Sequence, residues 1–257
     1  MASQDISALK NYKALLFDCY GVSRNACTPL HQTLIDWERG LLATPQIRGL
    51  LAQDGAPDEQ GLLAAFSPNE VRVQAATPGI VYDEVLTQAF KDTAHDLGLS
   101  ATDADAKAFG DSVPSWPAFP DSADALKRLS DMGLKLIIHS NVHNAGFAAS
   151  RKKLEKGYEF DQVFTAENIG SYKPDHRNFE YSIRRLKELY GIERDEILVT
   201  ANSKLHDHEP GHIAGLKGAW ISRPGANMGV KKFDHIVPDW EFPTMMDFAD
   251  AMEKARV

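Results

Sequence analysis

The stretch Ala14-Leu15-Leu16-Phe17-Asp18-Cys19-Tyr20-Gly21 decides the fold class of this chain. Its apolar first half is typical of a strand that is buried on both faces of a parallel sheet. The run ends in a carboxylate and a glycine, so the strand would bring Asp18 to the carboxyl edge of that sheet. Open α/β sheets bind their ligands at this edge. We therefore expect Asp18 to belong to a functional site, as a nucleophile, a metal ligand or a base.

Composition and charge narrow the class of protein. The chain has 257 residues, enough for one large domain or for a core with a modest second domain. The formal net charge of −8 disfavours a nucleic-acid-binding surface, because phosphate binding requires a basic face. Two cysteines, Cys19 and Cys27, provide no disulfide framework, and neither a secretory signal nor an apolar run of membrane-spanning length is evident. We expect a cytoplasmic protein with no nucleic-acid partner and no membrane association.

Strand-like and helix-like patterns alternate along most of the chain, which predicts βαβ units and a parallel sheet. The predicted strands are 13–18, 134–139, 162–164, 197–200, 219–221 and 235–237. The predicted helices between and after them are 121–132, 143–156, 175–190, 208–215 and 243–255.

A central block interrupts this alternation. Between about residues 37 and 112 the apolar residues recur at helical spacing, and the proline-rich segment 114–120 precedes the return to the sheet. The sequence therefore predicts an α/β protein with a Rossmann-like parallel sheet core and helices on both faces. The core would comprise 1–36 and 116–257, and an α-helical cap, 37–115, would be inserted after the first strand.

Three further segments place polar side chains at strand ends or helix starts. They are His139-Ser140-Asn141, Ser171-Tyr172-Lys173-Pro174-Asp175 and Asn202-Ser203-Lys204-Leu205-His206-Asp207. Each has an ordinary structural interpretation as a turn, a solvated lysine or a helix-capping acid. Taken in order with Asp18, however, the set of nucleophile, hydroxyl and amide, lysine and acid resembles the haloacid dehalogenase superfamily of hydrolases, over essentially the whole chain.

Two positions make the resemblance closer to the 2-haloacid dehalogenases than to the phosphatases of that superfamily. The phosphatases have a second Asp two residues after the nucleophile, where this chain has Tyr20, and commonly an Asp where it has Asn202. Their second acid protonates an alkoxide, and their Mg²⁺ shields the phosphoryl group, whereas a halide leaving group needs neither. The resemblance implies a type II (S)-2-haloacid dehalogenase that acts on a small organic acid without a cofactor. A Mg²⁺-dependent phosphatase of a small metabolite remains the alternative.

The resemblance also implies roles for individual residues. Asp18 would displace halide from C2 of a 2-haloacid, and water would then hydrolyse the aspartyl ester. Lys173 would keep Asp18 ionised, Ser140 would hold the substrate carboxylate, and Asp207 would orient the water. The implied substrate-binding residues are Asn141 near the halide, together with Thr33, Tyr20, Asn202 and Ser203. No residue is predicted to bind a metal, and a homodimer formed through the cap is a further implication.

The chain departs from the bacterial dehalogenases at several positions. Phe179 and Lys204 stand where those enzymes have Tyr and Asn. The halide-binding Arg of their cap has no assigned counterpart here, and Arg39 and Arg72 are two candidates. The segment 206–210, His-Asp-His-Glu-Pro, is more similar to dehalogenase-like proteins of fungi.

A zinc-protease pattern competes for part of the same region. His208-Glu209-Pro210-Gly211-His212 matches His-Glu-x-x-His, which requires both histidines on one face of a continuous helix. Proline belongs in the first turn of a helix and not in its interior, so the pattern favours the start of a helix over a zinc site.

An interruption follows Gly21. If Val22–Gln32 is removed, the chain reads Asp-x-Tyr-Gly-Thr-Leu-x-Asp, the opening expected of a haloacid dehalogenase, with Thr33 as the hydroxyl of the nucleophile loop. Val-Ser can be encoded by the splice-donor sequence GTGAGT, and Gln by the splice-acceptor end CAG. The segment is therefore either a retained intron or a genuine loop insertion, which surface connections tolerate. If it disturbs the motif, the chain as written would be an inactive member of the family.

Overall fold

The computed structural model describes residues 4–20, 33–77, 79–223 and 235–257, so the Val22–Gln32 segment lies outside the described residues. Its centre is a six-stranded sheet in the order β3-β2-β1-β4-β5-β6, in which every pair of neighbours is parallel. The strands are β1 (Ala14–Phe17), β2 (Lys135–Ser140), β3 (Gln162–Thr165), β4 (Ile197–Ala201), β5 (Lys217–Ile221) and β6 (Trp240–Phe242).

Helices occupy most of the remaining described chain. The α-helices are α1 (Trp37–Leu42), α2 (Pro45–Leu51), α3 (Glu59–Ala76), α4 (Tyr82–Asp96), α5 (Asp103–Gly110), α6 (Ser122–Asp131), α7 (Asn144–Leu154), α8 (Ala166–Ile169), α9 (Arg177–Tyr190), α10 (Glu209–Ile213) and α11 (Met245–Lys254). Short 3-10 helices are η1 (Ser7–Asn11), η2 (Val113–Ser115) and η3 (Arg194–Glu196), and η4 (Lys204–His208) is a π-helix. Within the described residues, no helix combines the length and the apolar character needed to cross a bilayer.

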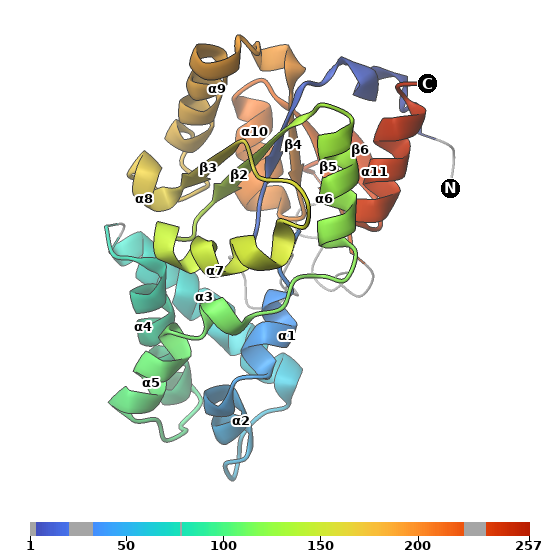
Figure 1. Cartoon of the computed structure of the whole chain (residues 1–257). Helices are drawn as coiled ribbons and strands as arrows, with labels where there is room; N and C mark the ends of the chain where they lie inside the picture. Colours follow the sequence, from blue (N-terminus) through green and yellow to red (C-terminus); the bar gives the residue numbers. More distant parts are fainter. Residues whose placement is uncertain (1–3, 21–32, 78, 224–234) are drawn as a thin grey trace.

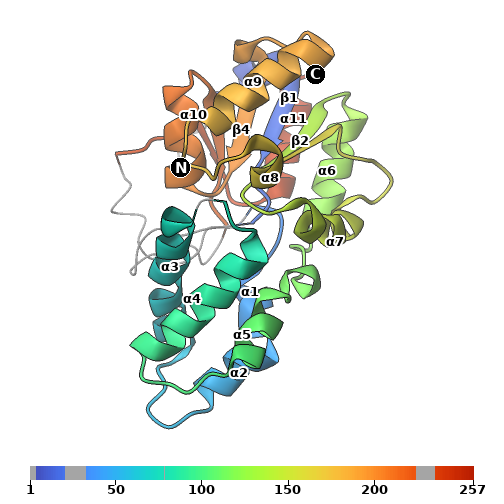
Figure 2. The ribbon, with the colours of Figure 1, turned by 90° about the vertical axis from the view of Figure 1, so that its left-hand side faces the viewer.

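Both faces of the sheet are covered by helices. Successive side chains of a strand point to opposite faces, so β1 contributes to two separate apolar clusters. Leu15 and Phe17 belong to the cluster that contains α6 and α11, whereas Leu16 belongs to the one that contains α9. Figures 1 and 2 show these helices on opposite sides of the strands. The predicted α/β fold with a parallel sheet and two covered faces is confirmed.

The last predicted strand was placed wrongly. The prediction put it at 235–237, but the strand that pairs with β5 is β6, in which Trp240 is opposite Ala219. Val237 is 69% exposed, whereas Trp240 is buried and packs edge-on against Tyr12 at 5.8 Å between ring centroids. Residues 235–237 are not a strand, because burial of the tryptophan determines which segment joins the sheet.

Helices α1 to α5 follow one another along residues 37–110 and form a separate lobe beyond the carboxyl ends of the strands (Figure 2). The chain enters this lobe through 33–36 and leaves it through 117–121. The two crossover segments pair with each other: Ile35 forms an antiparallel bridge with Ala118, Asp36 N donates to Pro117 O at 2.8 Å, and Phe119 N donates to Leu34 O at 3.0 Å. These paired segments are the connection between the helical lobe and the sheet.

Candidate active site

Asp18 follows β1 directly and lies at the carboxyl edge of the sheet, where it is only 4% exposed. Its Oδ1 accepts a hydrogen bond from Lys173 Nζ at 2.9 Å. Its Oδ2 is buried and has no hydrogen-bond partner among the described residues. The carboxylate therefore has one oxygen that is held in place and one whose lone pairs are uncommitted.

Lys173 contacts groups from three neighbouring parts of the sheet edge, at the carboxyl ends of β1 and β2 and in the segment that follows β4. Besides Asp18, its Nζ donates to Asp207 Oδ1 at 2.6 Å and to the carbonyl oxygen of His139 at 2.8 Å. Asn141 fixes the lysine backbone, since its Oδ1 accepts from Lys173 N at 2.7 Å and its Nδ2 donates to Lys173 O at 3.1 Å. The ammonium is thus held by one carbonyl and shared between two buried carboxylates.

Burial dominates the electrostatics of this group. Removal from water raises the pKa of Asp18 to about 7; the Lys173 ammonium opposes this rise, and the charge of Asp207 adds to it. Burial likewise raises the pKa of Asp207, against the effect of Lys173. Burial alone would lower the pKa of Lys173, but the two carboxylates outweigh it and the pKa is raised. Lys173 acts on Asp18 in the expected direction, yet it does not fully compensate for desolvation.

The predicted hydroxyl and amide lie beside this centre. Ser140 ends β2 and is buried; its Oγ accepts from Val142 N at 3.3 Å and retains its own proton for donation. Asn141 is also buried, and its amide oxygen and one amide hydrogen are used by the backbone of Lys173. In this structure Asn141 is therefore a support for the lysine.

Asp207 is carried by the π-helix η4, which follows β4. Ser203 caps this helix, because its Oγ accepts from His206 N at 3.1 Å. Asp207 Oδ2 has no partner among the described residues, as with Asp18 Oδ2. The predicted helix over 208–215 thus begins earlier and with a wider turn, which brings the side chain of Asp207 back to Lys173.

The remaining predicted residues lie around the centre in different ways. Asn202 N donates to Thr33 Oγ1 at 3.0 Å, its Nδ2 donates to Ile221 O, and its Oδ1 is buried without a partner among the described residues. Tyr20 donates from its hydroxyl to Ser150 in α7, so its polar end is directed toward that helix. Thr33 and Asn202 are therefore joined to each other, whereas Tyr20 is joined to α7.

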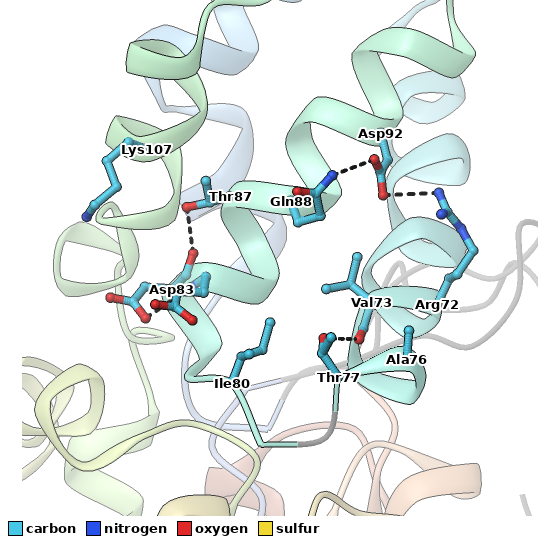
Figure 3. A pocket seen from close by; sticks show the side chains of 11 residues that line it. Arg72, Val73, Ala76, Thr77, Ile80, Asp83, Thr87, Gln88, Asp92 and Lys107 are labelled. Carbon is cyan, nitrogen blue, oxygen red and sulfur yellow. Dashed lines mark hydrogen bonds and ion pairs between the residues drawn. The ribbon is translucent and has the colours of Figure 1, made fainter.

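Neither Arg39 nor Arg72, the candidates for the halide-binding arginine, is paired with Asp18 or Asp207 among the described residues. Arg72 pairs with Asp92 at 3.1 Å on the wall of a cavity of about 650 Å³ that lies among α3, α4 and α5 (Figure 3). Arg39 lies on another cavity, of about 490 Å³, with Thr44 and Pro117. A third cavity, of about 620 Å³, lies between α3 and the segment 170–175 and is lined by Lys173. Of these three, the last is the one that adjoins the buried charges.

The His-Glu-x-x-His pattern does not form a metal site. His208 is buried and its Nε2 lies 3.0 Å from Ala201 O, while His212 Nε2 lies 3.1 Å from Asp239 Oδ2. Pro210 lies in the first turn of α10, as its chemistry requires. Among the residues that the structure describes, no three His, Cys, Asp or Glu side chains gather in a way that could hold a metal ion.

Two groups at the carboxyl edge of the sheet, the His139 carbonyl and the Arg223 side chain, could not be predicted from the sequence. The His139 carbonyl binds Lys173 through the backbone, which residue type does not reveal. Arg223, which follows β5, reaches Thr33 O with Nη2 at 2.8 Å. Its backbone has a φ of +46°, which no sequence pattern indicates for a non-glycine residue.

The chain is similar in sequence to known dehalogenases. An (S)-2-haloacid dehalogenase of Pseudomonas putida is 28% identical over 142 residues, which are 55% of this chain and 60% of that enzyme. The aligned region thus spans about three fifths of that relative. An (S)-2-haloacid dehalogenase of Pseudomonas sp. strain YL is 27% identical over 178 residues, which are 68% of this chain and 72% of that enzyme.

Solved structures share the fold at low sequence identity. An L-2-haloacid dehalogenase of Xanthobacter autotrophicus with chloropropionic acid covalently bound has a TM-score of 0.70 at 18% identity, covering 94% of this chain and 98% of its own. A Bacillus subtilis HAD-hydrolase bound to magnesium has a TM-score of 0.68 at 19% identity, covering 94% and 99%. The same fold therefore occurs in a structure with covalently bound chloropropionic acid and in one bound to magnesium. The family model of haloacid dehalogenase-like hydrolases matches residues 12–200, and this chain belongs to that family.

Proposed function

We propose that this protein hydrolyses a small 2-haloacid to the 2-hydroxyacid through an ester formed on Asp18. The observation that carries the proposal is that the two oxygens of the Asp18 carboxylate have different surroundings. Lys173 holds Oδ1 at 2.9 Å, and Oδ2 is buried without a partner among the described residues. A desolvated carboxylate oxygen with free lone pairs is a stronger nucleophile than a hydrated one, and a fixed partner oxygen keeps it oriented.

In the first step, Asp18 Oδ2 forms a bond to C2 of the substrate, and the carbon–halogen bond breaks with its electron pair on the halide. No proton moves in this step, which is consistent with Tyr20 two residues after the nucleophile and its hydroxyl directed to Ser150. The Ser140 hydroxyl retains a proton that can be donated to the substrate carboxylate. One displacement at C2 inverts the configuration of that carbon.

In the second step, water attacks the carbonyl carbon of the Asp18 ester. Asp207 Oδ2 is free to accept a hydrogen bond from this water and to take up its proton, which then passes to solvent. The second water proton goes to the departing alkoxide, which leaves as the 2-hydroxyacid, and Asp18 is restored as a carboxylate. Lys173 stays bound to Asp207 at 2.6 Å and stabilises the charge that develops on the ester oxygen.

The Mg²⁺-dependent phosphatase remains a second candidate because of one observation. Asp18 Oδ2, Asp207 Oδ2 and Asn202 Oδ1 are all buried oxygens without a partner among the described residues. Oxygen ligands of this kind suit Mg²⁺, which would shield an anionic phosphoryl group from Asp18. The absence of an acid at position 20 opposes this candidate, since an alkoxide leaving group would lack its proton donor.

We also propose that residues 37–115 act as a cap over the site and that 1–36 and 116–257 form the catalytic core. The 620 Å³ cavity between α3 and the Lys173 loop supports this division, because both lobes contribute to its walls.

A paired assay tests the proposal. The protein is incubated with (S)-2-chloropropionate or with p-nitrophenyl phosphate, each with Mg²⁺ and with a chelator. We expect chloride release that does not depend on Mg²⁺ and is abolished in Asp18→Asn. Mg²⁺-dependent turnover of the phosphate ester alone would overturn the proposal in favour of the second candidate.

A further inference from the structure

Arg223 occupies an unusual place in the fold. It follows β5 at the carboxyl edge of the sheet, is only 7% exposed, and has a φ of +46°. The left-handed region is unfavourable for a residue with a Cβ, and such a conformation persists only where surrounding contacts impose it. The Arg223 side chain makes contacts of this kind.

The guanidinium of Arg223 binds both crossover segments at once. On the entering segment, Nη2 donates to Thr33 O at 2.8 Å. On the returning segment, Nη1 pairs with Asp121 Oδ1 at 2.7 Å, and the guanidinium carbon lies 4.1 Å from the centre of the Phe119 ring. A planar guanidinium can bind a carbonyl and a carboxylate and stack on a ring together, which an ammonium cannot do.

The returning segment is itself anchored to the sheet domain. Asp121 Oδ2 accepts from Met246 N at 3.2 Å, in the first turn of α11. Ser122, the first residue of α6, donates from Oγ to Leu34 O at 3.0 Å and so adds a side-chain bond to the backbone bonds that join the two crossovers. Arg223 therefore connects a fixed point on the core to the chain that enters the helical lobe.

The entering segment is in turn bonded to both catalytic loops. Ile35 N donates to Cys19 O at 3.0 Å, next to the nucleophile Asp18. Asn202 N donates to Thr33 Oγ1 at 3.0 Å, at the start of the loop that leads to Asp207. A displacement of Thr33 would reach Asp18 through one of these bonds and Asp207 through the other.

We propose that Arg223 is a positioning residue for the reaction: its guanidinium fixes the two crossover segments and thereby the relative placement of the Asp18 and Asp207 loops. The expected loss of kcat rests on the proposed dehalogenase function, whereas the expected loosening of the crossover segments does not. Because an error of about 1 Å in the placement of reacting groups can cost ~10²-fold in rate, loss of the guanidinium should lower kcat by roughly 10- to 100-fold. The guanidinium contacts neither Asp18 nor Ser140, the residues that contact the substrate in the proposed mechanism, so KM should change far less than kcat.

The experiment compares Arg223→Ala and Arg223→Lys with Arg128→Ala. Arg128 is the control, because it also joins two elements of the core, pairing from α6 with Asp250 and Glu253 of α11 and donating to Met246 Sδ. Among the described residues, its side chain is hydrogen-bonded to neither crossover segment. For each variant, kcat and KM for chloride release are measured with and without added guanidinium ion. Amide hydrogen exchange is followed in peptides that contain Asp36 and Phe119, whose N–H groups join the crossovers.

We expect Arg223→Ala to lose kcat, to regain part of it with guanidinium ion, and to exchange faster at the crossover amides. Arg223→Lys should keep the fold but recover little kcat, since an ammonium cannot replace the three contacts. Arg128→Ala should keep kcat and show no rescue. Unchanged exchange at the crossovers in Arg223→Ala, or a kcat per folded molecule equal to that of the wild type, would overturn the proposal. If the wild type releases no halide, the proposed function fails, and the exchange data still decide the role of Arg223.

Discussion

Lys173 donates from Nζ to Oδ1 of Asp18 at 2.9 Å and leaves Oδ2 of the same carboxylate without a partner among the described residues. The same ammonium binds Asp207 at 2.6 Å, so one positive charge serves two buried carboxylates. Removal from water is the main reason why the pKa of Asp18 is raised; the Lys173 ammonium opposes the rise, and the charge of Asp207 adds to it.

Replacement of Lys173 by Met should reduce activity in a pH-dependent way. An adjacent opposite charge lowers a carboxylate pKa by ~1–3 units, so its loss should reduce kcat/KM at neutral pH by about 10- to 1000-fold. Part of the loss should return at alkaline pH, where Asp18 can ionise without help. Removing one partner of a buried ion pair should also cost about 3–5 kcal/mol of the free energy of unfolding.

The control for this substitution is Lys135→Met, which breaks the half-exposed 2.6 Å pair with Asp161 at the far end of β2. It should leave kcat/KM unchanged at every pH. An activity loss in Lys173→Met that is the same at all pH values would contradict an electrostatic role for the lysine.

The rate should depend on pH through Asp18 itself. The nucleophile must be ionised, and burial raises the pKa of Asp18 to about 7. In the free enzyme, kcat/KM should therefore fall about tenfold per pH unit below pH 7, instead of staying level down to about pH 4. Initial rates of chloride release between pH 5 and 9 measure this, with circular dichroism to verify that the fold persists. A level kcat/KM down to pH 5 would show that Asp18 is ionised more easily than its burial implies.

Glu70 in α3 should make stability depend on pH. It is fully buried and accepts from the Tyr82 hydroxyl at 2.6 Å, and burial raises its pKa to about 8. Between its unfolded pKa of about 4.5 and about 8, the folded state keeps a proton that the unfolded state has released, so the free energy of unfolding falls as pH rises through this range.

The substitution Glu70→Gln mimics the protonated acid and should remove this dependence. The variant should match the wild type in urea unfolding near pH 5 and exceed it in stability at pH 9. Glu84→Gln, at an exposed position of α4, is the control and should follow the wild type at both pH values. Equal stability of Glu70→Gln and wild type at pH 9 would mean that Glu70 is ionised at no cost in the folded protein.

Deletion of residues 22–32 should increase activity. Ile35 N bonds to Cys19 O at 3.0 Å, so the described residues before and after the segment lie close together. The deletion restores the motif in which Thr33 belongs to the nucleophile loop. We expect a higher kcat for the deletion variant than for the full chain, measured as chloride release. Equal kcat values would show that the segment is a tolerated loop, and transcript sequencing across codons 21–33 would establish whether it is spliced.

The sequence predicted the fold better than it predicted the residues that hold the catalytic side chains in place. The alternation of apolar runs was sufficient for the parallel sheet, because a strand buried on both faces has few alternatives. It did not locate the last strand, because 235–237 and Trp240–Phe242 each have two apolar residues out of three, and only the packing of Trp240 on Tyr12 distinguishes them.

In the site, likewise, some residues could be predicted from the sequence and others could not. Asp18, Lys173 and Asp207 were identified from residue type and order, and the structure brings the three together. The use of Asn141 to hold the Lys173 backbone and the reach of Arg223 to Thr33 depend on loop conformation, which residue types do not encode. The sequence predicts that Tyr20 binds substrate, and this stays a prediction; the bond of its hydroxyl to Ser150 is a further contact that residue type does not reveal.

The central claim is that Asp18 attacks the substrate and that water then attacks Asp18. A single turnover in H₂¹⁸O, with enzyme in excess over (S)-2-chloropropionate, tests it most directly by mass spectrometry of the product and of the peptide that contains Asp18. We predict one ¹⁸O atom in the Asp18 carboxylate and none in the lactate, because the oxygen transferred to C2 comes from the enzyme. Lactate that carries ¹⁸O, with an unlabelled Asp18 peptide, would contradict the ester mechanism and indicate direct attack of water on the substrate.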